Sequence, residues 1–236
     1  MKKTPATHAL QIPDEVMKQW QESIDLIVAI AGIPVGLIMR IAEEDIEVFL
    51  ASQINGNPYH PGDRERLANS GLYCEEVIRS KHPLLVPNAL ADPKWRNNPD
   101  IKHNMVSYLG FPILLPDWTP FGTICILDCK ANPYSDTIYR LVGTCRDMIQ
   151  SHLELLCVNV ELSESNRNLR AYLDELQVLR ALIPRCASCK RVKDGEGRWS
   201  SVAEYLNTHS HACSTQEYCP GCGKKATDES ESSHSM

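Results

Sequence analysis

The stretch Val106–Leu127, VSYLGFPILLPDWTPFGTICIL, decides the fold. It contains two apolar, β-rich runs, Val106–Leu115 and Gly122–Leu127, separated by the turn Pro116-Asp-Trp-Thr-Pro120. Because strands joined by a short turn pair side by side, the stretch predicts two neighbouring antiparallel strands.

The segments upstream of this hairpin extend the same pattern. A second strand pair is predicted at residues 36–43 and 46–53, and helices are predicted at Asp14–Ala31 and Leu72–Lys81. Strands in pairs with a helix before and after them indicate an α+β fold, in which a mostly antiparallel sheet carries the terminal helices on one face.

Downstream, no proline or glycine interrupts Gln150–Ile183. Apolar residues recur there at alternating steps of three and four, with Ser165 in the one polar slot. We call these residues the helical seam: Leu155, Val158, Leu162, Leu169, Tyr172, Leu176, Leu179 and Ile183. The spacing is typical of a coiled coil, so we expect this helix to join two copies of the chain in a homodimer. The alternative is a long helix that lies along its own domain.

The bulk composition narrows the range of partners. The 236 residues carry a net charge of −6 at a pI of about 5.8, which disfavours a nucleic-acid surface. The longest uncharged run, residues 26–39, is too short and too broken by Gly32 and Pro34 to cross a membrane. With a polar first ten residues and no signal-peptide pattern, we expect a cytoplasmic protein.

Two C-x-x-C pairs near the C-terminus indicate a metal site. Each pair places two thiolates on a tight turn, and two such turns complete a tetrahedron around Zn²⁺. The expected ligands of this structural zinc are Cys186, Cys189, Cys219 and Cys222. A segment of about 50 residues cannot bury enough apolar surface to fold alone, so the metal would stabilise it. Redox-active pairs or plain thiols are the alternative. Three residues between the pairs are candidates to replace a ligand, the alternative being that they only form a polar loop: His209, His211 and Cys213.

Five segments carry a family resemblance. They are Gly71–Ile78, Pro83–Ala89, Asp92–Ile101, Ser107–Ile113 and Phe121–Asp128. Together, over about residues 20–155, they resemble the GAF domain, especially its bacterial signal-transduction subtype. The resemblance implies a central antiparallel sheet, a small-molecule pocket roofed by loops between its third and fourth strands, and terminal helices that often pair in dimers.

The region after the long helix has a resemblance of its own. Residues 182–199, with the later Cys219–Cys222 pair, resemble a cysteine-rich tail that follows sensor domains or receivers in bacterial signalling proteins. A histidine common before the second pair of that tail has Gln216 or Glu217 near its place here. The resemblance therefore supports a zinc-ribbon-like module and implies no reaction.

The resemblance also selects candidates for the pocket. They come from the expected roof, the short helix beneath it and the following strand: Cys74, Asn88, Trp95, Met105, Tyr108 and Phe111. The alternative is that the aromatic residues fill the core and Asn88 caps a turn. The ligand itself is not specified by the sequence.

These readings predict five segments. They are a flexible N-terminus at 1–13, a GAF domain at 14–150, a coiled-coil signalling helix at 151–183, a Cys₄ zinc module at 184–225 and a disordered tail at 226–236. The chain has no P-loop, Rossmann, HExxH or nucleophile-elbow pattern. We therefore expect a non-enzymatic sensor or adaptor that relays a signal along the helix to a protein partner.

Two other functions stay open at this level. One is thiol chemistry, either a redox sensor or an enzyme like the GAF proteins that reduce free methionine sulfoxide, acting through Cys74 or the C-x-x-C pairs. Cys125 and Cys129 lie roughly 13 Å apart along one strand, too far to bridge. The other is nucleic-acid contact through the basic residues of the zinc module: Arg185, Lys190, Arg191, Lys193 and Arg198.

Overall fold

The computed structural model describes residues 10–180, 182–208, 213–217, 219 and 222. The predicted disordered tail, residues 1–9 of the predicted flexible start, His209 and His211 lie outside the described residues. Contacts divide the chain into one unit at 1–161 and a second at 162–236. Among the described helices, none is both long enough and apolar enough to cross a lipid bilayer.

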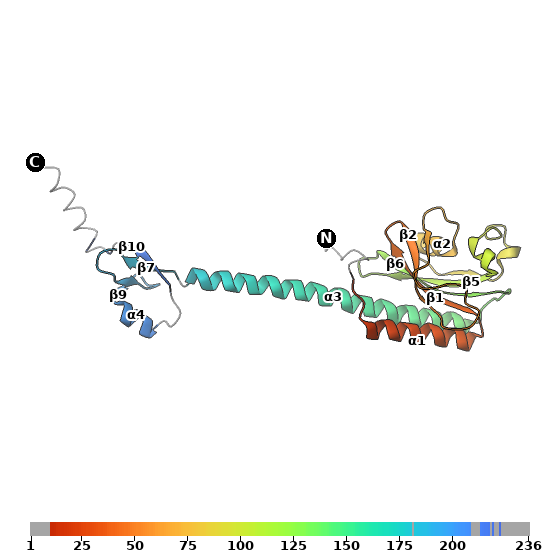
Figure 1. The fold of residues 1–236 in the computed structure, drawn as a ribbon, viewed down its shortest axis with the longest axis horizontal. Helices are drawn as coiled ribbons and strands as arrows, with labels where there is room; N and C mark the ends of the chain where they lie inside the picture. Colours follow the sequence, from red (N-terminus) through yellow and green to blue (C-terminus); the bar gives the residue numbers. More distant parts are fainter. Residues whose placement is uncertain (1–9, 181, 209–212, 218, 220–221, 223–236) are drawn as a thin grey trace, which may run out of the picture. The chain divides into compact units, whose positions relative to one another are not determined.

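A six-stranded antiparallel sheet forms the centre of the first unit (Figure 1). The strand order is β3-β2-β1-β6-β5-β4. The strands are β1 (Val35–Ala42), β2 (Asp45–Ala51), β3 (Arg64–Arg66), β4 (Leu84–Val86), β5 (Ser107–Leu114) and β6 (Pro120–Asp128). Both predicted hairpins are present, as β1–β2 and β5–β6. The predicted antiparallel α+β fold is therefore confirmed.

Two long helices cover one face of this sheet. They are α1 (Asp14–Ala31) and the first part of α3 (Asp136–Arg180) (Figure 1). The core beneath them is built from buried apolar side chains of both helices and the sheet, including Trp20, Ile24, Ile38, Ile124, Val142 and Ile149. Leu10 is also buried in this core, so the described end of the N-terminal segment packs against the unit.

Shorter elements cover the other face of the sheet. They are α2 (Tyr73–Ser80) and the 3₁₀ helices η2 (Ala89–Ala91) and η3 (Pro99–His103). A second core lies beneath them, with Leu37, Val48, Tyr73, Val77, Tyr108 and Leu127 among its members. The sheet therefore separates two cores, and only the second one contains the cavity described below.

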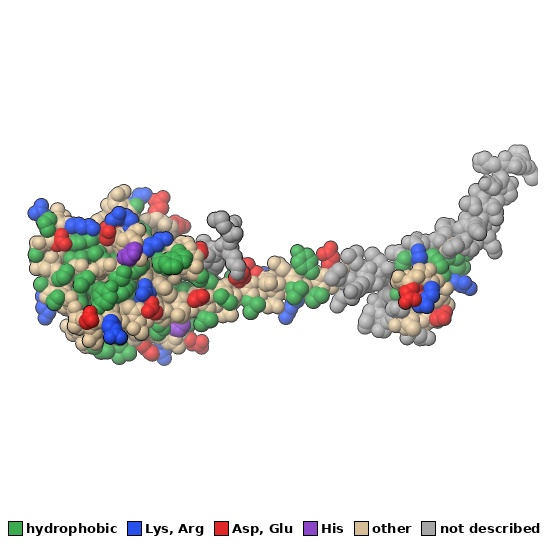
Figure 2. Space-filling model, turned by 180° about the vertical axis from the view of Figure 1, so that it is seen from behind, with side chains coloured by type: hydrophobic (Ala, Val, Ile, Leu, Met, Phe, Trp, Pro, Cys, Tyr) green, Lys and Arg blue, Asp and Glu red, His purple; other side chains and the backbone are tan. Residues whose placement is uncertain are grey.

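The helical seam is exposed over its described part. Among the α3 side chains that the structure describes, Leu153 is the last buried one. The seam residues Leu155, Val158, Leu162, Leu169 and Tyr172 have exposed fractions between 52% and 66%. Apolar side chains are visible on the surface of this part of α3 (Figure 2). The side chains of the last three seam residues lie outside the described set. An apolar stripe that a single chain leaves in water is available to a second helix.

The second unit contains a small sheet of order β10-β7-β8-β9. Its elements are β7 (Leu182–Cys186), β8 (Val192–Lys193), β9 (Trp199–Ser200), α4 (Val202–Thr208) and β10 (Cys213–Glu217). β10 pairs in parallel with β7, and the other pairs are antiparallel. Because the described strands of this unit are only two to five residues long, we expect the unit to need a source of stability beyond apolar burial.

Candidate functional site

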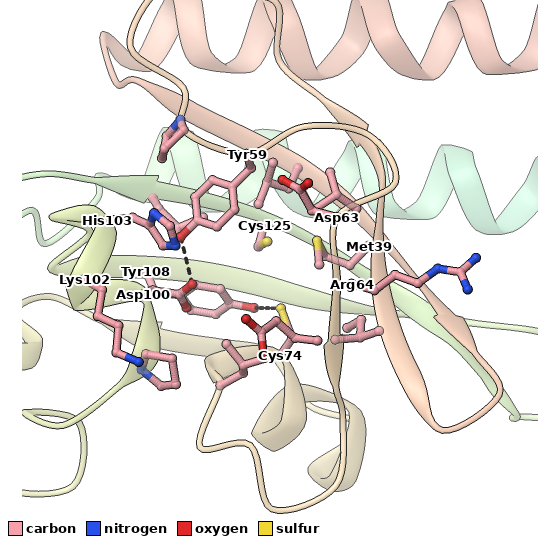
Figure 3. A pocket seen from close by; sticks show the side chains of 18 residues that line it. Met39, Tyr59, Asp63, Arg64, Cys74, Asp100, Lys102, His103, Tyr108 and Cys125 are labelled. Atoms are coloured by element: carbon pink, nitrogen blue, oxygen red, sulfur yellow. Dashed lines mark hydrogen bonds between the residues drawn. The ribbon is translucent and has the colours of Figure 1, made fainter.

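A cavity of about 350 Å³ lies in the first unit on the α2 side of the sheet (Figure 3). Its apolar wall comes from the sheet strands: Leu37, Met39, Ile46, Val48 and Leu127. Its polar lining comes from η3, from β3 and from the segment that precedes β3: Tyr59, Asp63, Arg64, Glu65, Asp100, Lys102 and His103. An apolar wall with a few convergent polar groups is typical of a small-molecule site.

One polar pair spans the two loops that close the cavity. The Tyr59 hydroxyl donates a hydrogen bond of 2.8 Å to Asp100 Oδ1, and its ring lies 5.3 Å from that of His103 (Figure 3). Burial raises the pKa of the Asp100 carboxyl above its ordinary value, although the bond from Tyr59 opposes this shift. Burial and the neighbouring Asp100 raise the pKa of Tyr59, which therefore stays a neutral donor. Asp100 retains acceptor capacity for a ligand group.

The inner wall carries a sulfur-centred cluster. Cys74, near the start of α2, accepts a hydrogen bond of 3.3 Å from the Thr123 hydroxyl, and its sulfur lies 3.5 Å from the Tyr108 hydroxyl. The pKa of Cys74 is lowered, first by hydrogen bonding from the Cys125 thiol and then by the Thr123 and Tyr108 hydroxyls. Burial acts in the opposite direction and raises the pKa of Cys74. The same interaction with Cys74, together with burial, raises the pKa of Cys125. The pKa values of the two thiols are thus shifted in opposite directions.

The structure brings two of the six predicted pocket residues to the cavity. Cys74 and Tyr108 line it. Trp95 and Met105 are buried in the same core without lining the cavity, and the Trp95 ring lies 5.0 Å from that of Tyr73. Asn88 caps η2, where its side-chain oxygen accepts from the Leu90 backbone N–H at 3.1 Å. These three residues therefore do not line the cavity.

Phe111 requires a correction. It lies in the core on the opposite face of the sheet, where its ring is 4.9 Å from that of Tyr139 in α3. The reason is strand geometry: side chains alternate between the faces, so residues three apart, such as Tyr108 and Phe111, point to opposite sides. Phe111 therefore helps to seat α3 on the sheet and does not touch a ligand in the cavity.

Sequence reasoning missed several residues of this site. Tyr59 and Asp100 come from segments for which the sequence predicts neither a strand nor a helix, and nothing local marks the two residues as neighbours. Cys125 had a signal: with Leu127 it shares one face of β6, and its register partner on β5 is Gly110. The sequence brings only Cys129 near Cys125, whereas in the folded unit Cys74 lies on the same cavity wall as Cys125.

An ion cluster at the rim of the cavity leads to a first testable prediction. Glu47 is buried and binds two guanidinium groups, Arg40 and Arg64, the latter at 2.7 Å. Burial raises the pKa of Glu47, but the two arginines outweigh burial and hold that pKa below its ordinary 4.5. Replacing Glu47 with glutamine is therefore expected to lower the free energy of unfolding by about 2 kcal/mol at neutral pH.

The pH dependence of stability checks the sign of this effect. A carboxyl whose folded pKa is depressed stabilises the fold above its unfolded pKa and loses that contribution as the pH falls through its folded pKa. The difference in the free energy of unfolding between wild type and Glu47→Gln, measured with denaturant, should hence shrink below about pH 4.5. A difference that is unchanged between pH 7 and pH 3 would contradict this role.

In the second unit, the four predicted metal ligands lie together. The sulfurs of Cys186, Cys189, Cys219 and Cys222 are all within 4.8 Å of one another. The Cys189 and Cys219 sulfurs are 3.6 Å apart, close to the edge of about 3.8 Å that a tetrahedron with 2.3 Å metal–sulfur bonds requires. Burial would raise the pKa of Cys186, but backbone N–H groups from Cys219, Cys189 and Ser188 lower it to about 6. The donor set fits a thiolate-preferring metal ion.

The remaining ligand and nucleic-acid candidates in this unit gain no support. The side chain of Cys213, in β10, lies outside the described set, like His209 and His211. Arg198 is paired with Asp194 at 3.0 Å and with Glu196 at 2.8 Å. The Lys190 ammonium donates to the Ala187 carbonyl at 2.6 Å. The Lys193 ammonium lies 5.9 Å from the centre of the Trp199 ring. Arg198, Lys190 and Lys193 are thus engaged within the unit.

Comparison with solved structures reports the same fold. The chain is similar to a methyl-accepting chemotaxis protein fragment (15% identity, TM-score 0.50, 61% of this chain and 90% of the other). It is also similar to the phycocyanobilin-bound GAF domain of a cyanobacterial phytochrome (13%, 0.50, 60% and 86%). A third similar structure is free methionine-R-sulfoxide reductase from Neisseria meningitidis with its substrate (10%, 0.49, 61% and 80%). At such identities, the two likenesses with a TM-score of 0.50 show the fold alone.

The comparison of sequences decides to which family the chain belongs. A search of curated proteins found no match. The family model described as GAF domain matches residues 21–144, just over half of the chain and the whole sheet that holds the cavity. The resemblance read from the five segments is thereby confirmed, and the chain belongs to the GAF domain family.

Proposed function

We propose that this chain is a non-enzymatic signalling sensor. A small molecule binds in the cavity of the first unit, two chains pair along the helical seam, and the cysteine unit holds a structural zinc and contacts a protein partner. The observation that carries this proposal is the cavity itself, because it lies on one face of a sheet whose other face seats α1 and α3. The expected setting is the cytoplasm.

The ion cluster supplies the first step of a physical connection from the cavity to those helices. Arg64 lines the cavity, and its guanidinium is held by Glu47. The same carboxylate binds Arg40 on the neighbouring strand β1. A ligand that displaces Arg64 would change the partners of Glu47 and thereby the position of Arg40. This is a route for a signal within the sheet, and its strength is set by the ligand's preference for one arrangement.

A series of aromatic contacts supplies the second step. The Arg40 guanidinium lies 4.4 Å above the Phe49 ring, and Trp20 of α1 meets Phe49 edge-on at 6.2 Å. The Trp20 indole N–H donates a 3.0 Å hydrogen bond to His152 Nδ1 on α3. His152 lies three residues before Leu155, the first residue of the helical seam. A change at the cavity could hence reach the helix that we expect to pair with a second chain.

The lining also limits the ligand. The apolar wall of the cavity fits a mainly apolar body, and Asp100 beside Tyr59 accepts a hydrogen bond from an N–H or O–H group. We therefore expect a small organic molecule with at least one donor at one end.

Filling the cavity tests this function. Val48 lines the cavity from β2 and is buried, so Val48→Phe places a ring in the space that the ligand would occupy. Small molecules released by unfolding the purified full-length protein would be measured by mass spectrometry. We expect wild type to release one compound in near-stoichiometric amount. Val48→Phe should release at least about ten-fold less of it, which corresponds to a loss of about 1.4 kcal/mol in binding free energy.

The matched control is Leu85→Phe in β4. Leu85 belongs to the same unit, is exposed and does not line the cavity, so this variant should retain the compound. Melting curves of both variants verify that each is folded. If wild type and Val48→Phe release the same compounds in the same amounts, the cavity is not a ligand site and the proposed function fails.

A further inference from the structure

Two cysteines from different elements meet at the inner wall of the cavity. Cys74 belongs to α2 and Cys125 to β6, both thiols are reduced, and both line the cavity (Figure 3). The Cys74 sulfur lies 3.3 Å from the hydroxyl oxygen of Thr123, which is two residues before Cys125 on the same face of β6. The Tyr108 hydroxyl, 3.5 Å from that sulfur, lies over Gly110, the register partner of Cys125 on β5. The two cysteines are 8% and 1% exposed, so a reagent small enough to enter the cavity can reach the pair while large reagents cannot. The proposed sensing function does not use this pair.

The surroundings of the two sulfurs are unequal. Cys74 receives the Thr123 hydroxyl at 3.3 Å and faces the Tyr108 hydroxyl at 3.5 Å, in addition to Cys125. These donors lower the pKa of Cys74, whereas the pKa of Cys125 is raised by its bond with Cys74 and by burial. Since the thiolate is the nucleophilic form of cysteine, the first sulfur to react is that of Cys74. Cys125 remains a thiol on the wall of the same cavity.

We propose that Cys74 is a peroxide-reactive thiol and that Cys125 converts its oxidised form into a disulfide. The substrate is a small hydroperoxide, ROOH, that enters the cavity. The Cys74 sulfur attacks the outer oxygen; an S–O bond forms, the O–O bond breaks, and the thiol proton leaves with the alcohol, ROH. Cys74 is then a sulfenic acid. The Cys125 sulfur attacks it; an S–S bond forms, the S–O bond breaks, and water leaves with the Cys125 proton.

The product would alter the site directly. The disulfide ties α2 to β6 and removes the two thiols from the cavity wall, while Thr123 and Tyr108 lose the sulfur that they contact. Two electrons pass from the thiol pair to the hydroperoxide, and a dithiol reductant restores the pair. The first unit would then have two covalent states that differ at the floor of the cavity.

Thiol mapping of the full-length wild-type protein tests this proposal. The protein is treated with hydrogen peroxide at low molar excess, quenched in acid, unfolded, alkylated and digested, and each cysteine peptide is quantified by mass spectrometry. We expect a peptide pair linked through Cys74 and Cys125. Cys145 in α3 is the internal reference because burial raises its pKa. The Cys74 thiol should disappear about ten-fold faster than the Cys145 thiol.

Two variants separate the two steps. In Cys125→Ser, dimedone added with peroxide should label Cys74, whereas in wild type the disulfide should keep that labelling low. In Cys74→Ser, Cys125 should stay reduced. The proposal is overturned if Cys74 and Cys125 are both recovered as free thiols when Cys145 is already oxidised, or if wild-type Cys74 is oxidised while Cys125 stays free. Wild-type mapping alone decides this, should either variant fail to fold.

Discussion

Replacing Leu162 with glutamate is expected to convert a dimer of this chain into a monomer. Leu162 is a central member of the helical seam and is 57% exposed in the single chain. In a coiled-coil dimer the introduced carboxylate would be buried beside the same charge from the second chain. A cost of about 4 kcal/mol would raise the dissociation constant roughly thousand-fold. Light scattering over a range of protein concentrations measures the change.

The neighbouring Ser163 provides the matched control. It is exposed on α3 and lies outside the seam spacing, so Ser163→Glu adds the same charge on another face of the helix. This variant should have the wild-type mass at each concentration, and both variants should retain the wild-type melting temperature of the first unit. A wild-type chain that scatters as a monomer, or a Leu162→Glu variant that remains a dimer, would refute pairing through the seam.

Removing the metal is expected to unfold the second unit. The four sulfurs fit one tetrahedral ion, and the small sheet of β7 to β10 cannot be stabilised by its own burial. Structural zinc binds with roughly 10–16 kcal/mol of free energy in comparable small modules, so its loss exceeds the stability available. We expect one zinc per wild-type chain, and none in Cys219→Ser or after treatment with a strong chelator. Elemental analysis measures the zinc.

Limited proteolysis reports the structural consequence. Residues 184–219 should become sensitive to trypsin in Cys219→Ser while the first unit stays resistant. Cys129→Ser is the control, because Cys129 is an exposed cysteine in the first unit, outside the cluster. It should change neither zinc content nor proteolysis. Wild-type protein that contains no bound metal and resists trypsin in both units would show that the cysteines do not form a structural zinc site.

The sheet hairpins were predictable because they are encoded locally. The apolar runs at 106–115 and 122–127 and the turn between them correspond to β5 and β6. The cysteine cluster was predictable for a similar reason, since each C-x-x-C turn fixes two sulfurs. By contrast, β3 has three exposed charged residues, Arg64–Arg66, and therefore no hydrophobic pattern. It forms only because β2 offers an edge to pair with.

The cavity could not be predicted in the same way. Tyr59 and Asp100 are 41 residues apart and meet only when two irregular segments fold over the sheet. Cys74 and Cys125 approach because α2 packs on β6, a contact for which the sequence contains no local signal. The error at Phe111 was avoidable. Applying strand alternation to β5 from Tyr108 onward assigns Phe111 to the face that α3 covers.

We propose that α3 joins two sensing units and that the four cysteines stabilise the second unit by binding zinc. Native mass spectrometry of the purified full-length protein measures both properties, because one spectrum reports chain number and bound mass together. We expect a species of twice 26.5 kDa carrying two zinc ions, with a further small-molecule mass on each chain. A metal-free species of 26.5 kDa at micromolar concentration would contradict this proposal.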